Sequence, residues 1–346
     1  MAGSARHVLC CLLWLLGVLW AQPTAAASVC SGPPLALQRL GPGLWWLPGQ
    51  PGEADAANRG QVSHLLLARQ PGRPGSLPHW WALGSGPTPA FGRRLACQVR
   101  QRLGGQVSDV ISPWARPELV LGVAGLATPP SLARRAVPRG AAGQPLRHWA
   151  HVTVADAMDQ QCARCVDRLA LRLQAAAGDL GDDPVRVPTL LLQGASGRLG
   201  PWRWWLLPRA EGRWITVWRA QGQPLWIAHG LLNADAPPDG RDADLLLMQQ
   251  SSSALATLAA ADGQAARFVG EQGGLMDSHA PARHAAYWAA LLQAVREAIE
   301  RGDDETAAAP ALAGFPSAWA GHPWHSFNWQ RAWRQVEPLV LAAPTR

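Results

Sequence analysis

The chain has 346 residues, of which 48% are hydrophobic and 16% are charged, and its formal net charge is +7. Hydrophobic content of this order is typical of globular proteins and excludes a chain too polar to form a core. All 31 basic residues are arginine, since the sequence contains no lysine. They are scattered instead of clustered, so the positive charge does not indicate a nucleic-acid-binding protein.

The N-terminus has the pattern of a secretory signal peptide. Arg6 and His7 precede an apolar run at 8–20, and small residues follow up to Ala27. We therefore expect residues 1–27 to be a signal peptide, residues 28–346 to form one domain, and the location to be periplasmic. An uncleaved anchor is the alternative. No later apolar run has membrane length, so we expect no membrane span after cleavage.

Strands and helices alternate in the first half of the chain. Turn residues and apolar spacing predict strands at 35–47, 62–68, 80–83 and 107–111. They predict helices at 89–103 and 117–126. This alternation is typical of an α/β protein.

Four cysteines follow the signal peptide: Cys30, Cys97, Cys162 and Cys165. Cys162 and Cys165 form a Cys-x-x-Cys motif within a segment of helical spacing. In an oxidising compartment this motif indicates a disulfide, a redox pair or two metal ligands. We expect a Cys162–Cys165 disulfide.

The second half repeats the rhythm of the first. It predicts strands at 189–193, 203–207, 214–218 and 225–228, and helices at 244–261, 283–301 and 324–336. The stretch 201–208 interleaves tryptophan with arginine and indicates either a core strand or an exposed recognition surface. Two α/β halves of similar size favour a pseudo-twofold sandwich of two sheets covered by helices.

Several stretches resemble a known family. They are "LPGQPGEADAANRGQVSHLLL" (47–67), "GSGPTPAFGRRL" (84–95), "WARPELVLG" (114–122), "CARC" (162–165), "GEQGG" (270–274) and "HSFNWQRAWRQVE" (325–337). The chain resembles the metallo-β-lactamase fold and, within it, the zinc metallohydrolases of the quinoprotein relay system. Those are exported proteins associated with PQQ-dependent alcohol dehydrogenases. The resemblance implies an αββα four-layer sandwich of the metallo-β-lactamase type.

The zinc ligands of that family do not match. In its His-x-His-Pro-Asp-His motif the ligand positions here hold Trp114, Arg116, Glu118 and Leu119, and the remaining site positions fall on Gly84, Arg209, His229 and Gln272. Leucine and tryptophan offer no donor for zinc, and arginine stays protonated. The resemblance therefore implies a site that has lost its metal. We expect no cofactor and no catalytic residue at these positions.

This leaves three hypotheses about function. The first is a non-catalytic pseudo-hydrolase, an accessory or binding protein whose partner is a periplasmic quinoprotein dehydrogenase. The second is an active hydrolase with a relocated zinc site, for which His229, His279 and His284, together with Glu271, are the candidate ligands. The third is a binding module in which Arg116, Arg209 and His229 hold an anionic ligand.

Arg116 and Arg209 also predict an internal ion-pair cluster. Two guanidinium groups in the place of a metal centre are costly to bury unless carboxylates accompany them. Glu118 and Glu211 each lie two residues from one of these arginines. We expect Glu118 and Glu211 to be the partners.

Overall fold

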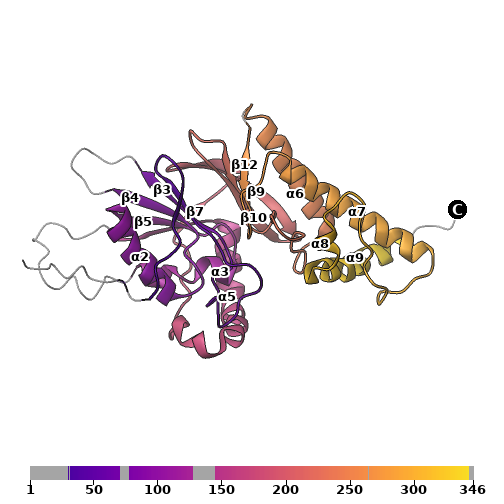
Figure 1. The fold of residues 1–346 in the computed structure, drawn as a ribbon, viewed down its shortest axis with the longest axis horizontal. Helices are drawn as coiled ribbons and strands as arrows, with labels where there is room; N and C mark the ends of the chain where they lie inside the picture. Colours follow the sequence, from indigo (N-terminus) through magenta and orange to yellow (C-terminus); the bar gives the residue numbers. More distant parts are fainter. Residues whose placement is uncertain (1–29, 31, 71–77, 128–144, 264, 343–346) are drawn as a thin grey trace, which may run out of the picture. The chain divides into compact units, whose positions relative to one another are not determined.

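The computed structural model describes residues 30, 32–70, 78–127, 145–263 and 265–342 (Figure 1). The chain divides into two compact units, residues 1–33 and 34–346. The expected signal peptide, residues 1–27, lies outside the described residues. Among the described residues, no helix has the length and apolar character needed to cross a membrane.

The first sheet of residues 34–346 has seven strands in sequence order. They are β1 (Gln38–Gly41), β2 (Leu44–Leu47), β3 (Leu65–Gln70), β4 (His79–Leu83), β5 (Gln106–Ile111), β6 (Arg147–His151) and β7 (Leu190–Leu192). Neighbours from β1 to β4 are antiparallel, and neighbours from β4 to β7 are parallel. The expected strand at 35–47 is therefore a two-stranded hairpin, β1–β2.

The second sheet has five strands in the order β12-β11-β10-β9-β8. They are β8 (Ser196–Leu199), β9 (Trp202–Ala210), β10 (Arg213–Ala220), β11 (Leu225–Ile227) and β12 (Arg267–Val269). Only the β11–β12 pair is parallel among the described strands of this sheet.

The helices are α2 (Pro89–Leu103), α3 (Pro117–Val120), α4 (Val123–Leu126), α5 (Val152–Leu173), the 3₁₀ helix η2 (Gln174–Leu180), α6 (Leu245–Ala260), α7 (Ala280–Glu300), α8 (Ser317–Ala320) and α9 (Pro323–Leu341). Helix α2 has the predicted bounds for local reasons. Pro89 opens it, the Thr88 hydroxyl accepts from the Phe91 N–H at 3.1 Å, and Gly104 ends it with φ +69°.

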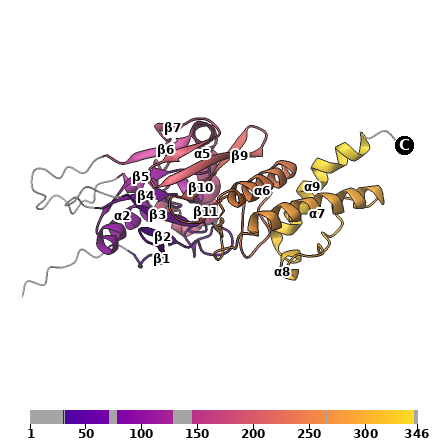
Figure 2. The same cartoon turned by 90° about the horizontal axis from the view of Figure 1, so that it is seen from above.

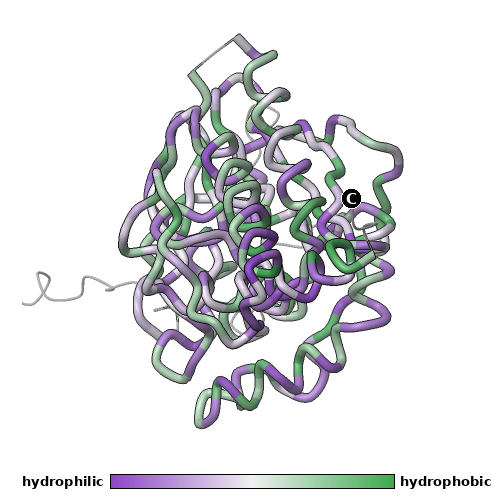
Figure 3. Tube along the Cα trace, turned by 90° about the vertical axis from the view of Figure 1, so that its right-hand side faces the viewer, coloured by the Kyte–Doolittle hydropathy of each residue, from purple (hydrophilic) through white to green (hydrophobic). Residues whose placement is uncertain are grey.

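Three hydrophobic clusters show that the sheets and helices form four layers. One cluster joins the first sheet to α2 and α5, and another joins the second sheet to α6, α7 and α9. The third cluster lies between the two sheets. The fold is therefore an αββα sandwich, as expected. Figures 1 and 2 both place α6, α7 and α9 together beside the second sheet, and hydrophobic and hydrophilic residues alternate at short intervals along the chain in Figure 3.

The Trp-rich strand β9 is part of the core. Trp202 and Trp204 are buried between the two sheets, and the ring centres of Trp204 and Trp218 of β10 lie 6.4 Å apart. On the other face Trp205 stacks on Trp226 at 4.8 Å. Of the two interpretations of 201–208, a core strand and an exposed recognition surface, the structure therefore favours the core strand.

Residues 117–126 differ from the single helix that was expected. They form two short helices, α3 and α4, with Leu121 and Gly122 between them. The Gly122 N–H donates to the Gly86 carbonyl at 2.8 Å, and a β-carbon at residue 122 would lie 2.0 Å from the Ser85 carbonyl oxygen. This close backbone approach, which helical periodicity does not reveal, replaces the continuous helix.

Candidate functional site

The site forms where parallel strands of the first sheet end. Gly84 follows β4, and the turn that carries Trp114 and Arg116 follows β5. Carboxyl ends of parallel strands are where open α/β sheets place their ligand sites. Gly84 has φ +80°, and its N–H donates to the Ile111 carbonyl at 2.8 Å, which joins the two strand ends. Leu119 packs beside Gly84, so an apolar side chain fills this corner.

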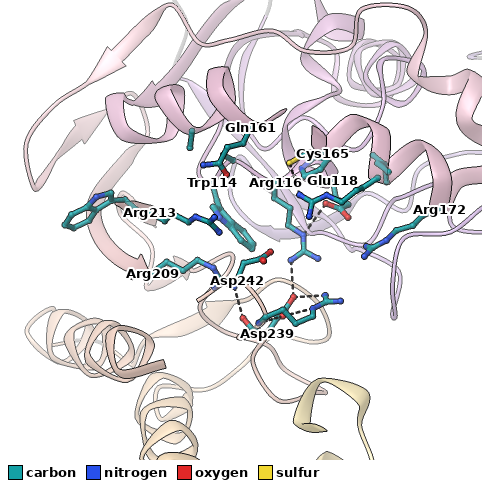
Figure 4. Close-up of a pocket in the computed structure, with 17 residues that line it drawn as sticks. Trp114, Arg116, Glu118, Gln161, Cys165, Arg172, Arg209, Arg213, Asp239 and Asp242 are labelled. Atoms are coloured by element: carbon teal, nitrogen blue, oxygen red, sulfur yellow. Dashed lines mark hydrogen bonds and ion pairs between the residues drawn. The ribbon is translucent and has the colours of Figure 1, made fainter. Parts of the chain in front are cut away.

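Arg116 lies at the centre of three carboxylates. Its Nε is 3.3 Å from Glu118 Oε2 and 3.8 Å from Glu271 Oε1, and its Nη1 is 3.8 Å from Asp239 Oδ2. Only 10% of the Arg116 side chain is exposed. Glu118 belongs to α3, Asp239 to the loop between β11 and α6, and Glu271 to the segment after β12. We call these four residues the Arg116 cluster, and Figure 4 shows Arg116, Glu118 and Asp239 of it.

Burial and charge oppose each other in this cluster. Burial alone would lower the pKa of Arg116, but the carboxylates, Glu271 first, raise this pKa well above its usual value. Burial would likewise raise the pKa of Glu271, but Arg116 and the neighbouring His229 and Ser63 hold it below its usual value. Arg116 and Glu271 therefore both stay charged at neutral pH. The expected ion-pair cluster forms around Arg116, with Glu118 as a partner.

Further ion pairs extend from Asp239 through Arg241 and Glu53 to Arg172. Arg241 donates to both of its oxygens, from Nε at 2.9 Å and from Nη2 at 2.8 Å. Glu53 lies 2.8 Å from Arg241 and 3.1 Å from Arg172. Burial would raise the pKa of Asp239, but the hydrogen bond from Arg241 and the charge of Arg116 hold it well below its usual value.

Arg209 is buried with backbone partners instead of a carboxylate. It donates to the carbonyls of Gly230 and Asp239, the latter at 2.7 Å, and lies 4.5 Å from the centre of the Trp114 ring. Burial lowers the pKa of Arg209 to about 10, and Asp239 opposes this shift. The expectation that Glu211 pairs with Arg209 is wrong. Glu211 lies in the turn after β9 ends and is exposed to solvent.

The three histidines expected at a relocated zinc site have other partners. His229 Nε2–H donates to the His64 carbonyl at 2.8 Å. His284 Nδ1–H donates to the Ala280 carbonyl at 2.8 Å, and its Nε2 accepts from the Asn233 N–H at 3.0 Å. His279 is exposed at the start of α7. Across the described residues, no group of three or more His, Cys, Asp and Glu could hold a metal ion.

The donor set does not fit zinc at the positions of the family motif. Trp114 and Leu119 have no lone pair to give, and Arg116 places a cation among the carboxylates that a dication would need. Gln272 uses its amide on the backbone of Gly52, donating from Nε2 at 2.8 Å. Arg116 is thus held in ion pairs and Gln272 in a hydrogen bond to the backbone.

A pocket of about 350 Å³ opens beside the Arg116 cluster. Its lining includes Trp114, Trp214, Gln161 and Cys165, together with three acidic residues, Glu118, Asp239 and Asp242. It also includes six arginines: Arg116, Arg168, Arg172, Arg209, Arg213 and Arg241. Of the three residues proposed to bind an anion, Arg116 and Arg209 lie on this pocket, while His229 contacts the His64 carbonyl.

The Cys-x-x-Cys motif lies within α5, and the expected disulfide is not formed. Cys162 and Cys165 are free, whereas Cys30 and Cys97 are disulfide-bonded. A position inside a regular helix holds the two β-carbons farther apart than a disulfide allows. Burial, and then the neighbouring Cys165, raise the pKa of the Cys162 thiol to about 12.

Sequence reasoning missed several residues of this site. Asp239 and Arg241 come from the turn "PPDGRDAD" (237–244), and Glu53 comes from the β2–β3 connection. An Asp-Gly pair indicates a turn but not its neighbours in space. The sequence indicates Glu271 only as a candidate zinc ligand, and its pairing with Arg116 is seen in the structure alone.

Comparisons with known proteins place the fold. No protein-family model and no curated protein sequence matches the chain. A β-lactamase domain protein from Burkholderia ambifaria is similar with a TM-score of 0.57 and 16% identity, over 87% of this chain and 90% of that one. A metallo-β-lactamase from Pontibacter korlensis has a TM-score of 0.50 and 12% identity, over 74% of this chain and 99% of its own.

A third structure, a metallo-β-lactamase from Hirschia baltica, has a TM-score of 0.50 and 11% identity, over 74% of this chain and 98% of its own. Identities this low show the fold and nothing about activity. The chain has the metallo-β-lactamase fold.

Proposed function

We propose that this protein works without zinc, as an exported pseudo-hydrolase that binds a ligand or partner in quinoprotein-dependent oxidation. The observation that carries the proposal is the Arg116 cluster. A fixed guanidinium pairs with Glu118, Asp239 and Glu271 in the frame where the fold's enzymes hold metal ions, and Arg241 pairs with Asp239 as well. Each of these carboxylates thus has a cationic side chain as its partner in the place of a metal ion.

Zinc hydrolases depend on a bound water whose pKa the metal lowers, and on open coordination positions. Arginine supplies neither, because it cannot act as a base at neutral pH or accept a lone pair. A binding role needs only the fold and a lined pocket. The pocket beside the Arg116 cluster is therefore the working surface in this proposal.

The placement in an exported quinoprotein system rests on the family resemblance of the sequence. The disulfide-bonded state of Cys30 and Cys97 supports an oxidising compartment. The partner would be a PQQ-dependent dehydrogenase. Native mass spectrometry of the exported protein mixed with such an enzyme tests this part, and a mixture that contains only the separate components would contradict it.

The zinc-free character has a direct test. Protein produced with added zinc, then desalted and analysed by inductively coupled plasma mass spectrometry, should retain well under one equivalent of zinc per chain. Retention of about one or two equivalents would overturn the proposal in favour of the active hydrolase. His229→Ala, His279→Ala and His284→Ala would then show which of these histidines hold the metal.

A further inference from the structure

The arginines of the pocket differ in whether they already have an anionic partner. Arg116, Arg172 and Arg241 pair with carboxylates, and Arg209 donates to two carbonyls. Arg168 and Arg213 form no ion pair within the described part of the chain. Both side chains are exposed to solvent, and Arg168 Nη2 lies 3.5 Å from Cys165 Sγ.

The charge of the lining is therefore unbalanced. Six arginines face three acidic residues of the lining, and Glu53 and Glu271 beside the pocket pair with Arg172 and Arg116. Six guanidinium groups therefore meet five carboxylates, of which Glu118 and Asp239 are used by Arg116 and Arg241. Asp242 is the remaining acid and can offset one of the two unpaired guanidinium groups. A partly enclosed pocket with excess positive charge concentrates anions.

The unpaired arginines come from different walls. Arg168 belongs to α5, and Arg213 opens β10 after the turn from β9. In Figure 4, Arg213 and the α5 residue Arg172 enter from opposite sides, with Trp114 and Arg116 between them. A small oxyanion with one charged centre would pair with the arginine of one wall. A molecule with an anionic group at each end would pair with Arg168 and Arg213 together, while its body lies against the Trp114 ring.

We infer that this pocket binds a small organic acid with two carboxylates, held between Arg168 of α5 and Arg213 of β10. The guanidinium group is planar and matches a carboxylate with two parallel hydrogen bonds. The pocket volume of about 350 Å³ lies within the range for small-molecule sites. The inference rests on the proposed binding role and assigns the ligand class. Arg116 and Arg209 also line the pocket.

Isothermal titration calorimetry at matched ionic strength tests the inference on the full mature protein. The probes are succinate, glutarate and adipate, with acetate and inorganic phosphate as single-centre anions. At least one dicarboxylate should bind saturably and roughly tenfold more tightly than acetate or phosphate, since it gains a second charge-assisted contact. Arg168→Gln and Arg213→Gln should each weaken that binding by about tenfold.

Arg164→Gln is the matched control, because Arg164 is exposed on the same helix and does not line the pocket. It should leave the affinity unchanged. Both pocket variants should keep the wild-type melting temperature, since neither arginine has an ion pair to lose within the described residues.

Dicarboxylates that bind no better than acetate would overturn the inference, as would phosphate binding as tight as the best dicarboxylate. An equal loss in Arg164→Gln would show general charge attraction and would also overturn it. Zinc content measured on the same sample separates the two proposals. Zinc-free protein that ignores dicarboxylates overturns only the ligand class, whereas zinc-loaded protein overturns the proposed function.

Discussion

Arg116 Nε lies 3.8 Å from Glu271 Oε1, so the turn after β5 of one sheet is paired with the segment after β12 of the other. Glu271 is fixed from its other side as well, because it accepts from the Ser63 hydroxyl and from the Gly230 N–H at 3.1 Å. The pair thus joins two sheet ends through charged groups that are almost fully buried. Its removal should have measurable consequences.

Replacing Arg116 with methionine should lower the free energy of unfolding by roughly 3–5 kcal/mol, since it leaves buried carboxylates without their cation. Urea denaturation at neutral pH measures the change. Arg164→Met, the same substitution at an exposed position of α5, should stay within about 0.5 kcal/mol of wild type. An unchanged or raised melting temperature in Arg116→Met would show that the arginine repels its surroundings instead of stabilising them.

The cost of removing Arg116 should shrink on mild acidification. In wild type, burial would raise the pKa of Glu271, but Arg116 holds it below its usual value, so its stabilising contribution is lost only as the pH falls through that lowered pKa. Without Arg116 the effect of burial remains, and Glu271 should take up a proton at higher pH. The stability difference between variant and wild type should therefore narrow from about pH 7 to about pH 5, by urea denaturation at each pH. A difference that stays constant, or narrows equally in Arg116→Met/Glu271→Gln, would contradict this.

The buried His284 should make the fold sensitive to acid above the carboxylate range. Burial lowers its pKa to about 4, although the Ala280 and Asn233 carbonyls beside its ring nitrogens oppose this shift. The unfolded chain binds a proton near pH 6.5 and the folded one only near pH 4, so stability should fall as the pH drops through this window. His284→Gln should flatten that part of the stability profile. The exposed His279→Gln should not, and equal slopes in all three proteins would reject this role.

The two free cysteines should differ in reactivity. Both are buried, but Cys165 lines the pocket and is 9% exposed, whereas Cys162 is 1% exposed and burial raises its pKa to about 12. Because the thiolate is the reacting form, iodoacetamide should label Cys165 of the native protein and reach Cys162 only after unfolding. Cys30 and Cys97 should be labelled only after reduction. Peptide mass spectrometry measures all four sites, and a Cys162–Cys165 disulfide in exported protein would contradict the free state.

Local sequence signals predicted much of the fold. The α2 bounds follow from Thr88, Pro89 and Gly104, which act within a few residues of the helix ends. The strands β6, β8 and β12 were not predicted, because their sequences RHWAH, SGRL and RFV lack the apolar run that marks the equally short β7 and β11. The break between α3 and α4 was not predicted either. It depends on the hydrogen bond from the Gly122 N–H to the Gly86 carbonyl, which only the tertiary structure brings together.

The candidate site could be predicted only in part. Arg116 and Glu118 are two residues apart, so their pairing was accessible from the sequence. Asp239 and Glu271 reach Arg116 from the other sheet, a relationship that no local pattern contains. Glu211 has the same two-residue spacing from Arg209 as Glu118 has from Arg116, yet it is exposed because β9 ends at Ala210. Spacing therefore supports a partner only when the residues share one structural element or turn.

The Arg116 cluster also has a consequence for the order of events in folding. Its four members come from the ends of both sheets, so their charges can meet only after each sheet has formed and the two have packed together. Interactions that form late are absent from the folding transition state. Loss of the Arg116 guanidinium should then leave the refolding rate nearly unchanged and appear almost entirely as faster unfolding. The Arg116 cluster should therefore slow the unfolding of the two packed sheets without changing how fast they fold.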